Sequence, residues 1–217
     1  MSKSEINTTA GVILAQVIVA IVGFLTLMSV FNFPDILRRS SQQRLSLFLE
    51  NSHIIVPTYF FLAMTGISQV VISVMLYRQF KEKTVLVTLG AVFGILCGIF
   101  QVIGFIRWPI LIPYLAQAQQ TSPEMVAFVE GAFNHYAGMA IGEHLGFLMQ
   151  AFWTLFIAAS ILKDKLFNKV LAFPGMIIGA LTILVALEPL APMFSILGEL
   201  TNSVILAWYI WLVYIAI

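Results

Sequence analysis

The residues best suited to chemistry include a glutamate and a histidine inside an apolar stretch, Glu143 and His144. A carboxylate in hydrocarbon is costly unless it is paired, protonated, metal-bound or hydrated. At about 100° per residue along a helix, Gln150 and Thr154 fall on nearly the same face as Glu143, interrupted only by Phe147. We therefore expect a polar stripe on this helix that faces the interior of a helical bundle.

A second polar face is predicted near the start of the last apolar segment, where Glu199 and Asn202 lie three residues apart on one side of a helix. Arg107 is the only cation at the end of the third apolar segment, and its guanidinium needs a partner there. A carboxylate matches its forked donors, so we predict an ion pair with Glu143, with Glu199 or lipid phosphate as alternatives. The residues predicted to line a ligand-binding cavity are Arg107, Glu143, Glu199 and Asn202.

The same region is also a candidate metal site. Imidazole and carboxylate suit zinc, iron or copper, and a catalytic site needs about three protein ligands plus an open position. The candidate ligands are His53, His135, Glu143 and His144. His135 points nearly opposite His144 around the helix, so a metal site would require His53, Glu188 or Glu199 to converge on Glu143 and His144. Haem is not expected, because the histidines lie at the outer edge and form no second pair.

Composition places these residues in a membrane protein. Of 217 residues, 60% are hydrophobic and 10% are charged, and the mean hydropathy is +0.99. The net charge of +1, without a long basic run, does not predict a basic surface for binding nucleic acid. The single cysteine, Cys97, excludes an internal disulfide. Membrane lipid is the partner that the composition itself implies.

Run lengths predict an all-α bundle of six transmembrane helices that uses residues 1–217 as a single domain. The stretch from Asp35 to Ser52 is too polar to cross and is predicted to be an outer interfacial helix. Two close prolines, Pro109 and Pro113, predict a broken or partly re-entrant element after the third span. The fourth helix is predicted to be extended, so that it projects beyond the bilayer or kinks near Gly138. The six spans are expected at 10–31, 53–77, 84–106, 123–162, 170–187 and 195–217.

Basic residues predict the orientation of the bundle. With six crossings both termini lie on one face, and seven of the eleven lysines and arginines fall on that face. The other four are Arg38, Arg39, Arg44 and Arg107. Because basic residues accumulate on the cytoplasmic side, both termini are predicted to be cytoplasmic. Most acids and all three histidines then fall on the outer side, so the cavity is expected to open outward.

Several motifs resemble those of a known family: the run from Arg107 to Pro109, the run from Pro113 to Ala116, and the run from Gly142 to Gly146, with Trp153 and Thr154. Together they resemble an uncharacterised family of six-helix bacterial membrane proteins, catalogued as a domain of unknown function. The resemblance covers nearly the whole chain and implies six spans in a bacterial inner membrane. That family has no assigned activity, so the resemblance implies no catalytic residue.

Three functions remain open from the sequence. The first is binding or transport of a small ligand in the outward-facing polar cavity. The second is a metal-dependent membrane enzyme, in which Glu143 and the histidines hold a cation that activates water. The third is a structural or accessory membrane protein whose polar residues only hold helices together. Phosphate-binding and dinucleotide-binding glycine motifs are absent from the sequence.

Overall fold

The chain forms a bundle of long helices in a computed structural model that describes residues 3–164, 167–190 and 197–216. The α-helices are α1 (Lys3–Phe31), α2 (Ser41–Gln79), α3 (Val85–Ala118), α4 (Pro123–Phe133), α5 (Gly146–Lys163), α6 (Ala172–Ala186) and α7 (Gly198–Ala216). Shorter helical elements are η1 (Asp35–Arg38), the π-helical η2 (Asn134–Leu145), η3 (Lys169–Leu171) and η4 (Glu188–Leu190). No strand occurs in the described part of the chain.

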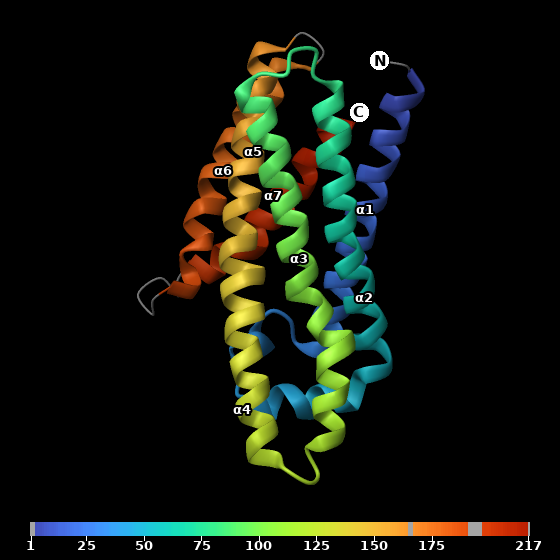
Figure 1. The fold of residues 1–217 in the computed structure, drawn as a ribbon, viewed down its shortest axis with the longest axis vertical. Helices are drawn as coiled ribbons and strands as arrows, with labels where there is room; N and C mark the ends of the chain where they lie inside the picture. The colour runs from blue at the N-terminus through green and yellow to red at the C-terminus, as the bar shows by residue number, and fades with distance from the viewer. Residues whose placement is uncertain (1–2, 165–166, 191–196, 217) are drawn as a thin grey trace.

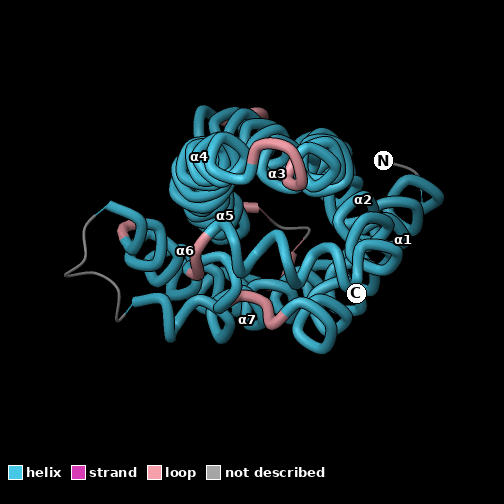
Figure 2. Tube along the Cα trace, turned by 90° about the horizontal axis from the view of Figure 1, so that it is seen from below, coloured by secondary structure: helices cyan, strands magenta, loops and turns pink. Residues whose placement is uncertain are grey.

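The predicted six-span, all-helical architecture is confirmed. Six helical segments are long and apolar enough to cross a membrane, and α4, η2 and α5 together form one of them, Pro123–Lys163. Contacts run from α1 to α2, α2 to α3, α3 to α5, α5 to α6, α6 to α7 and α7 back to α1, which closes the bundle (Figure 2). The start of α1 and the end of α7 lie at the same end (Figure 1). We call this the terminal end.

Close backbone approach holds neighbouring helices together inside the bundle. A Cβ atom added at Gly66 of α2 would lie 2.6 Å from the carbonyl oxygen of Gly98 on α3. Such small residues let helices pack where lipid removes the hydrophobic driving force between them. Large apolar side chains point outward instead: Ile18, Val22 and Leu25 of α1 are each more than half exposed. This pattern suits a bundle surrounded by lipid.

The predicted interfacial segment forms η1 and the first part of α2. Ser40 caps α2 in a reciprocal pair with Gln43, and the helix kinks at Asn51, whose backbone has φ −125° and ψ 18°. Figure 1 shows this first part crossing the bundle before α2 turns to run along it. Leu45 and Phe48 are buried, which anchors the apolar face of the segment on the bundle.

The predicted break at Pro109 and Pro113 is wrong. α3 continues as one helix from Val85 to Ala118, with both prolines inside it. Proline removes a backbone donor, but a helix tolerates this where neighbouring elements hold it in place. Trp108 and Ile112 on this part of α3 are each 1% exposed, so packing outweighs the local effect of the prolines.

The fourth span has the predicted extra length. Figure 1 shows α4 and the C-terminal end of α3 reaching well below the lower ends of α6 and α7. Around the predicted kink, at Gly138, the structure has 12 residues of π-helix in η2. A Cβ atom added at Gly142 would lie 3.0 Å from the Cα atom of Gly104, so η2 packs directly on the backbone of α3. A π-helical stretch frequently marks a functional site.

Candidate functional site

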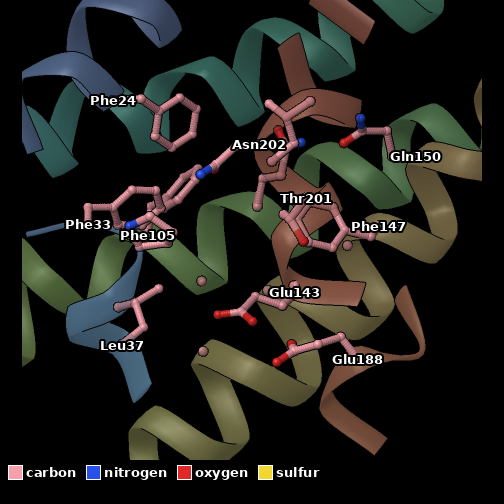
Figure 3. Close-up of a pocket in the computed structure, with 18 of the residues that line it drawn as sticks. Phe24, Phe33, Leu37, Phe105, Glu143, Phe147, Gln150, Glu188, Thr201 and Asn202 are labelled. Carbon is pink, nitrogen blue, oxygen red and sulfur yellow. The ribbon is translucent and has the colours of Figure 1, made fainter. Parts of the chain in front are cut away.

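A cavity of about 390 Å³ lies inside the bundle, between η1, α3, η2 and α7. The four residues predicted to line it, Arg107, Glu143, Glu199 and Asn202, all do so. Figure 3 shows Glu143, Glu188 and Asn202 around this space together with several aromatic rings. The aromatic lining residues include Phe24, Phe33, Tyr59, Phe105, Phe147 and Trp208. The cavity therefore combines an apolar wall with a few charged and amide groups, as small-molecule sites do.

Three charged residues from distant parts of the chain meet at one edge of this cavity. The Arg38 Nη2 atom lies 2.6 Å from a carboxylate oxygen of Glu143 and 2.6 Å from one of Glu188. Further contacts join Arg38 Nη1 to Glu143 at 3.3 Å and Arg38 Nε to Glu188 at 3.2 Å. This three-residue cluster, which we call the Arg38 bridge, ties η1 to η2 and η4.

The guanidinium of Arg38 is held in its charged form by its two acidic partners. Burial alone would lower the pKa of the Arg38 guanidinium, but hydrogen bonds and charge attraction from Glu143 and Glu188 outweigh burial and raise it. The Arg38 side chain is 39% exposed, compared with 19% for Glu143 and 14% for Glu188. The bridge therefore lies at the more exposed edge of the cavity rather than deep inside it.

The predicted ion pair between Arg107 and Glu143 is not formed, because Arg38 takes both oxygens of Glu143. Sequence reasoning had assigned Arg38 only to the interfacial segment. The turn that follows Pro34 brings Arg38 to residues that are 105 and 150 positions further along the chain. No local pattern in the sequence signals such a pairing.

Arg107 is buried and lines the cavity without an acidic partner in the described part of the chain. Its guanidinium donates to the carbonyl oxygen of Gly104 and, at 3.2 Å, to Oδ1 of Asn134. The guanidinium carbon lies 5.3 Å from the centre of the Trp108 ring. Gly138 makes room for it, since a Cβ atom there would lie 2.5 Å from Arg107 Nη2.

Tyr59 of α2 is a cavity residue that sequence reasoning missed. Its ring stacks on Trp108, with centroids 5.0 Å apart and planes at 12°. The side chain is 1% exposed, and its hydroxyl has no hydrogen-bond partner among the described residues. A tyrosine in an apolar stretch looks like an ordinary core residue, so the sequence holds no signal for this unsatisfied hydroxyl.

The three histidines have different surroundings. His53 and His135 are exposed, whereas the Nδ1 atom of His144 lies 2.6 Å from the carbonyl oxygen of Ala186. His144 therefore ties η2 to the end of α6. Within 3–164, 167–190 and 197–216, no group of three or more histidine, cysteine, aspartate or glutamate residues is arranged to hold a metal ion.

Comparison with models of protein families gives a match. The model of the family described as "Domain of unknown function (DUF4386)" matches residues 8–214. No curated protein and no solved structure matches the chain. The family match spans nearly all of the chain and confirms the resemblance to a family of unknown function. The chain therefore belongs to the DUF4386 family and is a multi-pass membrane protein of that family.

Proposed function

We propose that this protein binds a small ligand in the cavity bordered by the Arg38 bridge. One observation carries the proposal: a predominantly apolar bundle contains a cavity of about 390 Å³ that is lined by charged and amide side chains from several helices. This volume falls within the usual range for small-molecule sites. Hydrogen bonding between helices alone would not require such a space, whereas ligand binding does.

The cavity is proposed to open to the outer side of a bacterial inner membrane, with both termini in the cytoplasm. The support is the seven-to-four distribution of basic residues between the two faces. η1 and η4, which carry two members of the Arg38 bridge, lie away from the terminal end of the bundle (Figure 1). A ligand would then enter beside Arg38 without crossing the hydrophobic core of the bilayer.

Cysteine labelling in intact bacterial cells tests the cavity and its sidedness. The single cysteine, Cys97, is buried, and Cys97→Ala gives a background without reactive thiols. In that background Asn202→Cys reports on the cavity, while Ile210→Cys, exposed on the same helix, reports on the lipid-facing surface. Glu82→Cys, between α2 and α3, reports on the terminal end.

A membrane-impermeant methanethiosulfonate reagent is expected to modify Asn202→Cys in intact cells and Glu82→Cys only after permeabilisation. Ile210→Cys should stay unmodified in both conditions. Modification of Asn202→Cys only after permeabilisation would place the cavity on the cytoplasmic side. No modification in either condition would mean that water does not reach the cavity, and the proposal would fail.

Ligand occupancy needs a separate measurement. Thr201 lines the cavity (Figure 3), so Thr201→Trp places a bulky ring in it. We expect small ring-bearing probes, tested as carboxylate, amide and amine, to raise the melting temperature of the wild type. The same probes should leave Thr201→Trp unchanged. Equal responses of the two proteins to every probe would refute binding in this cavity.

A further inference from the structure

We propose that Arg107 and Tyr59 form an anion-binding site within this cavity, which takes the carboxylate or phosphate group of a small organic anion. The inference rests on the proposed ligand-binding function and names the class of ligand. The Arg107 guanidinium supplies the positive charge and most of the donors. The hydroxyl of Tyr59 supplies one further donor.

Arg107 forms no ion pair with an acid among the described residues. Its side chain donates to a carbonyl and an amide oxygen, both neutral, and several of its five N–H donors have no partner in the described part of the chain. Arg44 is buried to a similar degree but forms a two-pronged ion pair with Glu130, at 2.8 and 2.6 Å. Among residues 3–164, 167–190 and 197–216, the fold therefore gives one buried arginine an ion-pair partner and gives none to the other, which lines the cavity. A bound anion would neutralise Arg107 as Glu130 neutralises Arg44.

Tyr59 supports the site independently of charge. Its buried hydroxyl has no hydrogen-bond partner among the residues that the structure describes, and an unsatisfied buried donor is costly in a folded protein. Tyr59 lines the same cavity as Arg107, and both pack against the ring of Trp108. Water in the cavity would satisfy the hydroxyl, but it would not balance the guanidinium charge. An anion satisfies both groups at once.

The surroundings hold these donors in place before a ligand binds. Asn134 accepts from Arg107 and donates to the carbonyl oxygen of Leu37, at 3.2 Å in each case. Gly138 leaves space for the guanidinium, and the stacked ring of Trp108 fixes Tyr59. Donors fixed in this way bind an anion without losing side-chain freedom.

The other side chains that line the cavity indicate the chemistry of the rest of the ligand. Aromatic side chains form much of the cavity, so an apolar or aromatic body fits beside the anionic group. The acids that line the cavity repel negative charge, and Arg38 offsets part of this repulsion; they are Asp35, Glu143, Glu188 and Glu199. A ligand with a single negative charge therefore suits the site better than a dianion.

Calorimetric titration of the full-length protein in phosphatidylcholine nanodiscs tests the site. The probes are 2-naphthoate, 2-naphthamide and 2-naphthylmethylamine, which share one ring system and differ in charge. The variants are Tyr59→Phe, which removes only the unpartnered hydroxyl, and Arg107→Gln. Arg78→Gln is the matched control, because Arg78 is an exposed arginine at the terminal end that pairs with Glu5.

We expect 2-naphthoate to bind with one site per chain and at least about tenfold more tightly than the amide or the amine. Tyr59→Phe should weaken naphthoate binding about tenfold without lowering the melting temperature, because the hydroxyl makes no hydrogen bond to any described residue. Arg107→Gln should weaken it about a hundredfold, and Arg78→Gln should change nothing. Tyr59→Phe keeps the test decisive if Arg107→Gln does not fold.

Equal affinities for 2-naphthoate and 2-naphthamide would refute the anion site and leave the ligand-binding cavity intact. Absence of naphthoate binding to the wild type would also refute it. Failure of Asn202→Cys to react, by contrast, would refute the proposed ligand-binding function, because water would then not reach the cavity. Repeating the titration in phosphatidylglycerol nanodiscs identifies the source of the anion. Competition by this lipid assigns the site to a lipid phosphate, and an unchanged affinity assigns it to a soluble anion.

Discussion

Loss of either partner of the ion pair between Arg44 and Glu130 should strongly destabilise the fold. Both side chains are almost fully buried, at 5% and 2% exposure, and two charge-assisted hydrogen bonds join them. Arg44 belongs to the interfacial part of α2, and Glu130 belongs to α4. Arg44 also donates to the carbonyl oxygens of Leu37 and Arg39, in and next to η1. The pair therefore clamps the segment that carries Arg38 onto the bundle.

Removing one partner leaves the other as an uncompensated buried charge. We expect Arg44→Met and Glu130→Leu each to lower the free energy of unfolding by about 3–5 kcal/mol. The double variant leaves neither charge behind, and its two apolar side chains occupy similar volumes. We expect it to cost at least about 2 kcal/mol less than the sum of the two single changes.

Denaturation in mixed detergent micelles measures these free energies, and hydrogen exchange of residues 35–50 localises the effect. The matched control is Arg78→Met, since the ion pair of Arg78 with Glu5 is exposed, at 69% and 45%. That change should cost less than about 1 kcal/mol. Additive losses in the two single variants and the double variant would refute the reasoning. So would a Glu130→Leu loss as small as that of the control.

Three further predictions follow from close packing and from topology. Gly138→Ala places a methyl group against Arg107 and should weaken binding of 2-naphthoate about tenfold in calorimetry, whereas Gly11→Ala, with no neighbour within 4 Å, should not. Gly98→Ala drives a methyl group into the backbone of α2 and should lower the free energy of unfolding by about 1–3 kcal/mol, so a loss near zero in detergent denaturation would contradict the packing. Alkaline phosphatase fused after Glu82 should be inactive and the same enzyme fused after Thr121 active, and the reverse result would invert the predicted orientation.

The fold was largely predictable because its main determinant is local. A helix needs roughly 20 consecutive apolar residues to cross a bilayer, and runs of that length are visible in the sequence. The interfacial segment was equally visible, since three arginines are interspersed with apolar residues in it. At Pro109 and Pro113, the local sequence preference does not predict the observed structure. Their intrinsic effect favours a break, and packing of Trp108 and Ile112 on neighbouring elements overrides it.

Several residues that line the cavity could be predicted from the sequence, but the ion pairs among them could not. Arg107, Glu143, Glu199 and Asn202 stand out because each is polar in an apolar run, and each lines the cavity. Which cation meets which acid depends on how η1 folds back over η2 and η4, between residues more than 100 positions apart. Side-chain chemistry alone does not determine whether Arg107 or Arg38 pairs with Glu143.

Three arginines of this protein carry the same charge and differ in what the fold places beside them. Arg44 faces a buried acid, Arg38 shares two acids at the edge of the cavity, and Arg107 faces neutral oxygens, an aromatic ring and the cavity. A buried cation that forms no ion pair is less stabilised than a paired one, because its desolvation is offset only by more distant charges. Acidic residues are present at this end of the bundle, but Glu143 pairs with Arg38, the more exposed arginine. Under the anion-site proposal, the ligand therefore supplies the ion-pair partner that the described residues do not give Arg107.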